Sequence, residues 1–411
     1  MHILLIHQYF LEKEASGGAR FNEMTKFWTD QGHQVTVIAG MIHANGFTKA
    51  PKYRGKYFLF EEFAPNVKVL RCHVSENYNT NFSGRLWGYF SFVLSSLLGF
   101  LLKLNYKYDL VLCTSPPLFV GITGLLISRI NNIPLVFEVR DLWPESAIET
   151  GVLKSKILIE LSYYLESVIY QQAQLVNVLT PAFKDHLESK KNVPVSKICV
   201  ISNGCDFLYS DLALKGKSQK ELKAELGWSN QFIALYVGAH GVANHLEQIL
   251  DAASLLKNEN ILFVFIGDGM QKKFLEKMTL ELKLVNVTFL APVSKEKVFE
   301  YIKASDIGLS AMKRKPVFNT IYTNKAFDYM ACKTPALIMI DGVSRKLVEE
   351  SNAGLFAEPE NPADISQKLL WMENHPEALH QMGEDAYLYA KKNLDRSVLS
   401  QRYLDELARF H

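Results

Sequence analysis

Cysteine and net charge are both scarce in this chain of 411 residues. Its five cysteines contain no C-x-x-C pair, so neither a disulfide framework nor a thiolate zinc site is expected. The 45 Lys and Arg residues nearly balance 43 Asp and Glu residues, which leaves a formal net charge of +2. That balance excludes nonspecific nucleic-acid binding through global basicity, and 48% hydrophobic residues are typical of a globular protein.

Common nucleotide-binding motifs and a secretion signal are missing as well. No G-x-G-x-x-G follows the first predicted strand of either half, which argues against a dehydrogenase. The first loop of the second half also lacks the G-K-[ST] of a P-loop. Residues 1–7 are too short and lack the basic flank of a signal peptide, so they are predicted as a strand. A reducing cytoplasm is the expected location.

Short apolar runs alternate with helical patterns throughout the chain, which predicts α/β architecture with parallel sheets. The alternation breaks only at about 206–230, and the domain boundary is therefore predicted near residue 205. Two Rossmann-like, doubly wound domains, 1–205 and 206–385, are expected to face a central cleft, with ligands beyond the carboxyl ends of the strands. Strands are predicted at 2–7, 34–39, 67–71, 109–114, 134–138, 175–178 and 198–202, and then at 232–237, 261–266, 285–290, 307–310 and 335–340.

Three glycine-containing loops follow predicted strands. Glycines before a helix let backbone amides approach an anion, and the helix N-terminus adds partial positive charge. Each loop is also compatible with an ordinary βα turn, so the glycines alone leave both interpretations open. The candidate residues are Gly17, Gly18 and Arg20 in the first loop, Gly238, His240, Gly241 and Asn244 in the second, and Asp268 between Gly267 and Gly269 in the third.

Charged residues gather at two other predicted loops. Lys325 and Asp328 are three residues apart on a predicted helix, where a lysine can neutralise phosphate and a carboxylate can accept bonds from sugar hydroxyls. The alternative is a surface ion pair. Arg140 and Asp141 follow strand 134–138, with Glu145 four residues on, and charges at a strand end favour a functional role about as much as packing. The histidines form no metal constellation.

Residues 86–102 contain no charged side chain over a run long enough to approach a membrane span. Spanning would cut a βα domain in two and is rejected. Two interpretations remain, a buried helix of the first sheet or a helix that dips an apolar face into a bilayer interface. Trp87, Phe90, Phe92 and Leu98 are the candidate membrane contacts.

Taken in order, these segments resemble the family-four retaining glycosyltransferases of GT-B architecture, and within them the WbuB-like group that includes N-acetyl-L-fucosaminyl transferases. The specific motifs are Glu-Val-Arg-Asp-Leu-Trp-Pro-Glu-Ser at 138–146 and Lys-Ala-Phe-Asp-Tyr-Met-Ala at 325–331. Gly-Gly-Ala-Arg at 17–20, Thr-Ser-Pro-Pro at 114–117, Ile-Ser-Asn-Gly-Cys-Asp at 201–206 and the glycine loops add to them. The resemblance covers nearly the whole chain.

The resemblance implies a nucleotide-sugar donor held mainly by the second domain, an acceptor met mainly by the first, and no metal or other cofactor. Gly17 and Gly18 would approach the donor diphosphate, Lys325 would neutralise it, and Asp328 would bind the ribose. The backbone near Val293 would meet the base. His7, Ser115 and Glu145 would lie on the acceptor side, and residues 386–411 would form a helix returning to the first domain.

Three positions depart from the usual family pattern. Thr320 and Asp328 stand where the family usually has paired glutamates, and Ala239 and Asn244 stand where it has Arg and Lys. Arg140 replaces a common His beside Asp141. Diphosphate charge is then left to Lys325, Arg20 or backbone amides, and these departures suit the WbuB-like group.

The expected function is transfer of an N-acetylated, 6-deoxy, fucosamine-like hexose from UDP to a lipid-linked saccharide, with retention, in bacterial O-antigen or capsule synthesis. The enzyme would be cytoplasmic and peripherally bound to the inner face of the cytoplasmic membrane, without a nucleic-acid partner. A UDP-sugar 2-epimerase of the same architecture and a noncatalytic membrane-associated binding subunit remain as alternatives.

Overall fold

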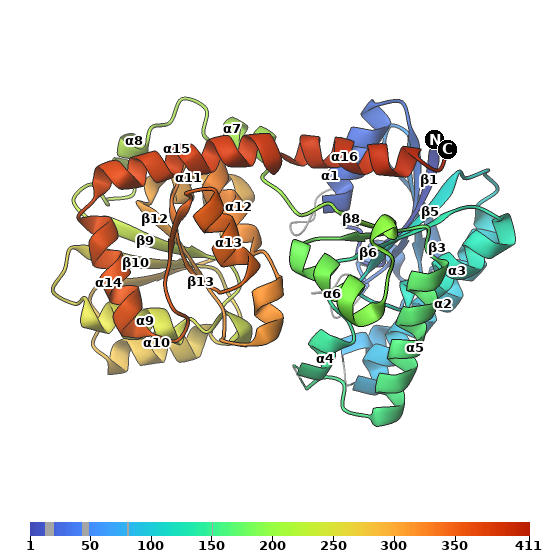
Figure 1. The fold of residues 1–411 in the computed structure, drawn as a ribbon, viewed down its shortest axis with the longest axis horizontal. Helices are drawn as coiled ribbons and strands as arrows, with labels where there is room; N and C mark the ends of the chain where they lie inside the picture. The colour runs from blue at the N-terminus through green and yellow to red at the C-terminus, as the bar shows by residue number, and fades with distance from the viewer. Residues whose placement is uncertain (13–19, 43–48, 80–81, 150) are drawn as a thin grey trace. The chain divides into compact units, whose positions relative to one another are not determined.

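The computed structural model describes residues 1–12, 20–42, 49–79, 82–149 and 151–411 (Figure 1). They form two compact units, here called unit 1 (Met1–Ser202 with Ser400–His411) and unit 2 (Asn203–Leu399). The sequence predicts the boundary at 205 and a separate segment 386–411. The observed division falls after Ser202, and residues 386–399 belong to unit 2.

Unit 1 is built on an eight-stranded sheet in the order β3-β4-β2-β1-β5-β6-β7-β8. All neighbours are parallel except β3, which pairs antiparallel with β4. Strand β3 is not predicted from the sequence, because its side chains are half-buried or exposed and lack the apolar run of the inner strands. The strands are β1 (His2–Ile6), β2 (Gln34–Gly40), β3 (Phe58–Ala64), β4 (Val67–Cys72), β5 (Leu110–Ser115), β6 (Leu135–Val139), β7 (Leu175–Val178) and β8 (Ile198–Val200).

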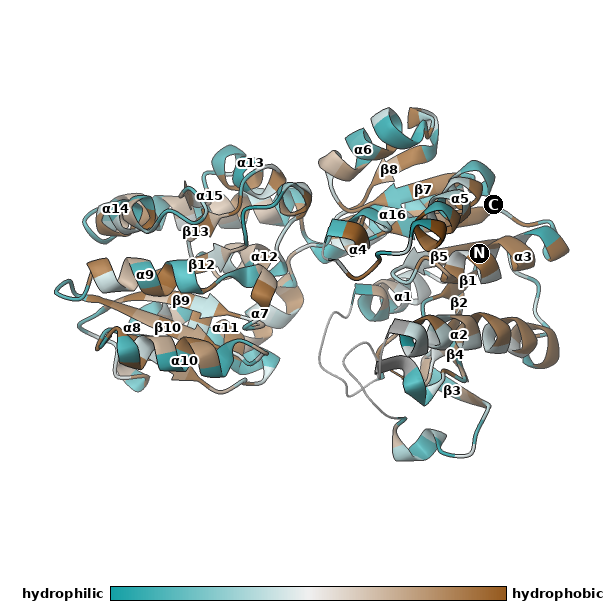
Figure 2. Ribbon diagram, turned by 90° about the horizontal axis from the view of Figure 1, so that it is seen from below, coloured by the Kyte–Doolittle hydropathy of each residue, from teal (hydrophilic) through white to brown (hydrophobic). Residues whose placement is uncertain are grey.

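Helices lie on both faces of this sheet (Figure 1). They are α1 (Arg20–Asp30), α2 (Phe82–Lys103), α3 (Val120–Asn131), α4 (Glu145–Glu149), α5 (Lys156–Gln172) and α6 (Pro181–Lys191), with 3₁₀ turns η1 (Pro51–Tyr53), η2 (Glu76–Asn79) and η3 (Val195–Lys197). Helix α2 contacts β4, β2 and α3, and α3 contacts α5 in turn. By length and composition alone α2 could cross a membrane, but 44% of its most apolar window is buried within the protein. Figure 2 shows hydrophobic residues along most of α2.

Unit 2 contains a six-stranded, all-parallel sheet in the order β11-β10-β9-β12-β13-β14. Alternate residues of its strands fill cores on opposite faces, for example Phe263 and Phe265 on one and Val264 and Ile266 on the other. Burial on both faces explains why these strands are nearly continuous apolar runs. They are β9 (Phe232–Val237), β10 (Ile261–Ile266), β11 (Val287–Leu290), β12 (Ile307–Ala311), β13 (Ala336–Met339) and β14 (Gly354–Phe356).

The stretch predicted to lack strands, 206–230, holds two short helices. The helices of the C-terminal half are α7 (Phe207–Ala213), α8 (Gln219–Glu225), α9 (Glu247–Leu255), α10 (Lys272–Glu281), α11 (Lys295–Ala304), α12 (Asn324–Ala331), α13 (Val343–Glu350), α14 (Pro362–Glu373), α15 (Pro376–Asn393) and α16 (Arg396–Ala408), with 3₁₀ turns η4 (Val242–Asn244) and η5 (Pro316–Thr320). The end of α16 packs in unit 1, where the fully buried Trp28 donates a 3.0 Å hydrogen bond from Nε1 to the Ser400 carbonyl. The ring of Tyr403 lies edge-on to Trp28 at 5.8 Å.

Both sheets reverse their strand order once, between β1 and β5 in unit 1 and between β9 and β12 in unit 2. Crevices form at such a point beyond the carboxyl ends of the strands, and ligands of doubly wound sheets bind there. The two places at which a site is expected are therefore set by the backbone topology.

Candidate active site

Helix α12 is hydrogen-bonded to β9 and β12, the two strands between which the strand order of unit 2 reverses. This reversal, and that between β1 and β5 in unit 1, is called the switch point of its sheet. The buried Tyr329 hydroxyl lies 3.2 Å from the Leu235 carbonyl of β9 and 2.9 Å from the Leu309 carbonyl of β12. Its ring occupies the space where a side chain at Gly308 would begin, because a Cβ there would lie 2.4 Å from the ring. The start of α12 is thereby held at the carboxyl edge of the two central strands.

Lys325 stands one turn before Tyr329 on the same helix, and its ammonium lies over the ring of Tyr236, 5.0 Å from the centroid. A Cβ built on Gly238 would lie 3.9 Å from the Lys325 Nζ, so this cation sits against the loop that follows β9. Burial lowers the pKa of Lys325 to about 8, against the opposing attraction of Asp328. The result is a half-buried lysine at the strand switch whose positive charge is poorly compensated.

The glycine loops beside Lys325 pack against each other at backbone distance. A Cβ on Gly267 (φ +145°) would lie 2.0 Å from the Gly238 carbonyl oxygen, and one on Gly269 would strike the backbone of His240. The Ala239 carbonyl accepts bonds from the Tyr236 hydroxyl at 2.9 Å and from Asn244 Nδ2 at 2.8 Å. The side chain of Asn244 therefore shapes this loop, which does not leave it free as a diphosphate ligand.

His240 is a second candidate ligand in this loop. Its side chain is fully buried, with the rings of Tyr236, Phe265 and Phe289 within 6.4 Å. Burial lowers its pKa to about 4, so the imidazole is neutral at physiological pH. The ring packs against aromatic side chains of unit 2 and both of its nitrogens lack a hydrogen-bond partner among the described residues, so a donor-binding role for His240 stays a prediction.

Asp328 interacts electrostatically with Lys325 and with a group of charged residues that includes Asp206. Asp206 pairs with Lys295 and, at 3.0 Å, with Arg396. Burial raises the pKa of Asp328 to about 6, while the positive charges of Arg396 and Lys295 oppose that rise. With this pKa the carboxyl group is mostly ionised at pH 7 and can accept hydrogen bonds from hydroxyl groups.

The other donor-side candidates are dispersed around these loops. Asp268 is exposed, and its Oδ1 accepts the Gly269 amide at 2.8 Å. Thr320 lies in η5 and donates to the Val317 carbonyl at 2.7 Å, and Val293 packs partly against the core before α11.

Gly17 and Gly18 lie outside the described residues. No group of three or more His, Cys, Asp or Glu that could hold a metal ion occurs among the residues described here.

In unit 1, Arg20 has a structural contact in place of the expected diphosphate role. Its guanidinium pairs with the fully buried Glu138 at 3.2 Å and donates to the Ile201 carbonyl at 2.7 Å and to that of Ser202. Asn177 donates a further bond to Glu138 at 2.8 Å. The assignment of Arg20 to the donor is wrong in this structure, because its donors are occupied by groups that join α1 to the ends of β6 and β8.

The polar residues after β1, β5 and β6 gather at the switch point of unit 1. His7 is buried, and its pKa lies well below the usual value because of burial and the positive charges of Arg140 and Arg71. The Ser115 hydroxyl donates to the Glu138 carbonyl at 3.2 Å. Asp141 accepts a 2.8 Å bond from the Ser146 hydroxyl, and burial raises its pKa despite that bond. The arrangement offers a neutral histidine and a partly desolvated carboxylate.

Comparisons with known proteins match both units. The model described as "Glycosyl transferase 4-like domain" matches residues 17–204, and "Glycosyl transferases group 1" matches residues 218–389. The putative colanic acid biosynthesis glycosyl transferase WcaI of Escherichia coli is 22% identical over 98% of this chain and 99% of its own length. Each unit therefore matches a glycosyltransferase family model, and the chain has the GT-B glycosyltransferase fold.

Two further similarities extend this result. The probable glycosyltransferase WbjE of Pseudomonas aeruginosa is 24% identical over 63% of this chain, which spans 64% of that relative's length. The structure of HepE from Anabaena in complex with UDP covers 100% of both chains with a TM-score of 0.71 and 16% identity. The predicted architecture of two Rossmann-like domains is confirmed for this glycosyltransferase.

Glu145 lies in a pocket of its own on the glycosyltransferase's unit 1. Its carboxylate pairs with Lys191 at 2.5 Å and stands 3.5 Å from His186, and these partners outweigh its burial and lower its pKa to about 2. Lys191 also pairs with Glu166 at 2.6 Å. The expected acceptor-side carboxylate is therefore engaged in an ion-pair cluster between α4, α5 and α6, apart from the pocket that Asp141 lines.

The four candidate membrane residues of the glycosyltransferase fall on two faces of α2. Trp87, Phe90 and Leu98 are exposed by 54%, 40% and 45%. Phe92 is fully buried, so its assignment to a membrane-facing surface is wrong. Residues 91–93 and 95–96 form the buried face, because a helix turns about 100° per residue and separates Phe92 from Phe90.

The sequence does not predict the groups that hold these sites in place, which are Tyr329, Glu138, Asn177 and Asp206. Their signals are weak in a single sequence, although a glutamate and an asparagine inside apolar strands, as in Val136-Phe137-Glu138-Val139 and Leu175-Val176-Asn177-Val178, are costly to bury without partners.

Proposed function

We propose that this glycosyltransferase moves an N-acetylated, 6-deoxy, fucosamine-like hexose from a UDP-sugar to a lipid-linked saccharide, with retention of configuration. The setting would be bacterial surface polysaccharide synthesis, at the inner face of the cytoplasmic membrane. The name of WcaI refers to colanic acid biosynthesis, and the solved HepE complex contains UDP, which together support the polysaccharide class and the donor nucleotide.

The observation that carries the proposal is the cation of Lys325 against the Gly238 loop at the strand switch of unit 2. Transfer of a glycosyl group leaves a negatively charged diphosphate, and a desolvated ammonium stabilises developing charge more strongly than one in water. The backbone amides of the glycine loops supply further donors, which compensates for Ala239 and Asn244 at positions where the family usually has basic residues.

Asp328 and Asp141 take the remaining polar roles in this proposal. Asp328 would accept hydrogen bonds from the ribose hydroxyls. Because its pKa is raised to about 6, the carboxyl is ionised, and the contact is stronger, above about pH 6. Asp141, held by Ser146, would face the acceptor and the sugar. A metal ion has no role in the proposed reaction, because Lys325 and amide donors meet the diphosphate charge.

Release of UDP from candidate UDP-sugars in the presence of a lipid-linked saccharide tests the proposal. Lys325→Met is expected to lower turnover at least a hundredfold, whereas Lys303→Met serves as a matched control. Lys303 is also a half-buried lysine of unit 2 with a lowered pKa, but it lies near the end of α11 before β12, at the opposite edge of the sheet. Full activity of Lys325→Met would refute the assignment of Lys325 to the diphosphate.

Two added measurements separate the alternatives. Deuterium incorporation at the sugar C2 without an acceptor identifies a 2-epimerase, whereas tight donor binding with no transfer to any acceptor identifies a binding subunit. Transfer is expected to continue in EDTA, and a loss that Mg²⁺ restores would refute metal independence.

A further inference from the structure

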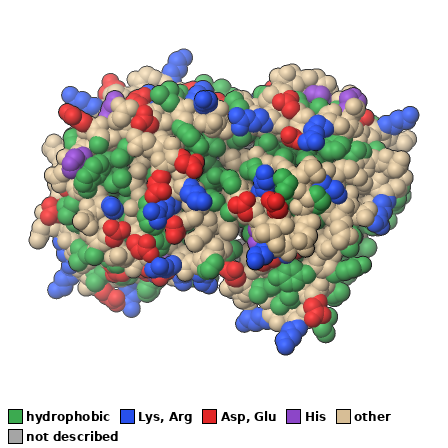
Figure 3. All heavy atoms as spheres, viewed as in Figure 1, with side chains coloured by type: hydrophobic (Ala, Val, Ile, Leu, Met, Phe, Trp, Pro, Cys, Tyr) green, Lys and Arg blue, Asp and Glu red, His purple; other side chains and the backbone are tan. Residues whose placement is uncertain are grey.

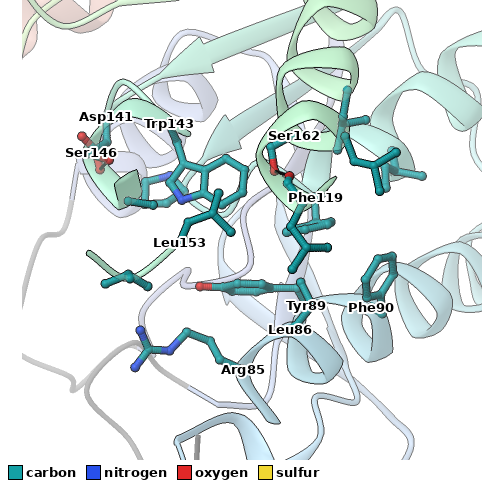
Figure 4. A pocket seen from close by; sticks show the side chains of 17 residues that line it. Arg85, Leu86, Tyr89, Phe90, Phe119, Asp141, Trp143, Ser146, Leu153 and Ser162 are labelled. Atoms are coloured by element: carbon teal, nitrogen blue, oxygen red, sulfur yellow. Dashed lines mark hydrogen bonds between the residues drawn. The ribbon is translucent and has the colours of Figure 1, made fainter. Parts of the chain in front are cut away.

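An apolar pocket of about 530 Å³ opens in unit 1 between α2, α3, α4 and α5 (Figure 4). Its volume lies within the range of pockets that hold a small organic ligand. Most lining side chains are aliphatic or aromatic, which disfavours a sugar or nucleotide as the main occupant. They are Leu86, Tyr89, Phe90, Phe119, Trp143 and Leu153, with other apolar residues of α3 and α5.

Several polar groups of this pocket lie on one side of it. In Figure 4 the guanidinium of Arg85 and the hydroxyl of Tyr89 project to the side where Asp141 and Ser146 lie, while Phe90 and Phe119 lie on the other side. The Nε of Arg85 is buried and has no hydrogen-bond partner among the described residues. A cavity with an apolar end and a polar side that holds the unpartnered Arg85 Nε matches an anionic amphiphile in polarity and, at Arg85, in charge.

The apolar end continues onto the surface of unit 1. Phe90, Val152 and Leu161 line the pocket and are themselves exposed by 40%, 45% and 57%. Beyond them the outer faces of α2 and α5 carry Leu94, Leu98 and Leu101 and then Ile157 and Tyr164, all exposed. These residues recur at three- and four-residue intervals, so each helix presents one continuous apolar face. Figure 3 shows hydrophobic side chains gathered where Figure 1 places α4 and α5.

Burial inside the protein does not explain this surface, because exposed apolar area of this extent marks an interaction site in a soluble fold. A hydrocarbon chain emerging from a bilayer would meet apolar side chains along its whole path from the outer face of α2 and α5 into the pocket. The phosphate of such a lipid would then reach the end that holds Arg85.

We propose that this pocket binds the hydrocarbon chain of a lipid phosphate, with Arg85 paired to the phosphate. The inference rests on the proposed function, since it identifies the lipid carrier of the acceptor as the occupant. It places the head of the acceptor beside Asp141, so the same pocket that holds the chain also positions the saccharide that follows the phosphate.

Titration calorimetry with dodecyl phosphate, below its micelle concentration and without vesicles, tests the pocket directly. Each buried CH₂ is expected to strengthen binding about fourfold, so dodecyl phosphate should bind well over tenfold more tightly than octyl phosphate. Inorganic phosphate should not bind measurably. Dodecanol should bind at least fivefold more weakly than dodecyl phosphate, because it lacks the charge that Arg85 meets.

Val152→Trp fills the pocket from its rim and is expected to weaken dodecyl phosphate binding at least tenfold. Val195→Trp is the matched control, since Val195 is exposed by 44% in the same unit but lies in η3, away from the pocket. Should Val152→Trp fail to fold, Leu161→Trp gives a second rim variant. Equal affinity of the rim variant and its control would place the ligand on the outer apolar face and overturn the pocket assignment.

Arg85→Gln should weaken binding of dodecyl phosphate at least fivefold and leave dodecanol binding unchanged, whereas Arg129→Gln on α3 should change neither. An unchanged affinity in Arg85→Gln would overturn the phosphate contact. Binding of UDP, measured on the same proteins, separates the two proposals. If UDP binding depends on Lys325 while lipid binding ignores the rim variants, the pocket assignment fails and the donor site stands, and the reverse pattern refutes the proposed function.

Discussion

If Lys325 meets the diphosphate as proposed, its lowered pKa predicts that UDP binding depends on pH. Burial is the larger influence and holds the pKa at about 8, so about nine-tenths of the free protein carries the ammonium at pH 7 and about one-tenth at pH 9. A diphosphate beside the ammonium favours its charged form and raises that pKa on binding. If only the charged form binds, the Kd for UDP rises about tenfold from pH 7 to pH 9, equivalent to about 1.4 kcal/mol.

Calorimetry at pH 8.5 in two buffers of different ionisation enthalpy measures the same effect as proton uptake. About three-quarters of a proton should be taken up per UDP bound, because the free lysine is mostly neutral at that pH. The second ionisation of a phosphate group, near pH 6, lies below this range and does not contribute. Lys325→Met should bind UDP weakly, with no pH dependence, while Lys303→Met should retain both the affinity and the uptake.

The same pKa predicts that removal of Lys325 stabilises unit 2. A pKa lowered from 10.5 to about 8 means that the folded state disfavours the charge, at a cost of at most about 3 kcal/mol at pH 7, where both states are protonated. That cost diminishes as the pH rises from about 8 toward 10.5, because the folded state then releases its proton first. Lys325→Met should therefore raise the melting temperature at pH 7. A pH-independent UDP affinity in the wild type, together with an unchanged or lower melting temperature in Lys325→Met, would refute this account.

Three other predictions follow from contacts within single units. Arg20→Met should cost about 3–5 kcal/mol of unfolding free energy in urea, because it leaves the buried Glu138 uncompensated, whereas breaking the exposed Arg409 pair with Glu406 should cost under about 1 kcal/mol. Tyr329→Phe should lower the free energy of unfolding by about 1–3 kcal/mol and weaken UDP binding through movement of α12. Gly308→Ala should destabilise the protein more on its own than in combination with Tyr329→Leu, which makes room for the added methyl group. Additive changes in unfolding free energy would contradict the contact between Gly308 and the Tyr329 ring. Leu98→Glu should abolish co-sedimentation with anionic vesicles without changing the melting temperature, because Leu98 is exposed. Phe92→Glu should unfold unit 1, because Phe92 is fully buried. Retention of vesicle binding by Leu98→Glu would exclude this face of α2 as the membrane contact.

Local patterns predict much of the fold because the central strands are buried on both faces. Runs such as Ile261–Ile266 and Phe232–Val237 identify parallel strands without knowledge of their neighbours, and the predicted GT-B architecture follows from their alternation with helices. Strand β3 does not follow, because Glu61 and Glu62 break its apolar pattern at the edge of the sheet. Its pairing with β4 is a tertiary fact that no window of sequence contains.

In the candidate site, too, local patterns predict some features and long-range contacts decide the others. The positions of Lys325 and Asp328 on one helix follow from their spacing, but the anchoring of that helix by Tyr329 to two strands does not. The two glycines before Arg20 predict a ligand contact for its side chain, whereas its partner Glu138 lies 118 residues away. The loop position of His240 predicts a ligand contact, yet its ring packs against Phe265 and Phe289, which only the folded chain reveals. In each case a long-range contact decides where a polar side chain points.

The packing of Ser400–His411 in unit 1 has a consequence for chimeras made with related glycosyltransferases. Unit 1 is discontinuous in the chain, so a single recombination point after Ser202 would combine the Trp28 site of one parent with the last helix of the other. The buried ring pair of Trp28 and Tyr403 would then join side chains that were never selected together. An exchange of donor specificity therefore needs two junctions, at 202/203 and 399/400, so that unit 2 is inserted as a cassette and both parental cores are preserved.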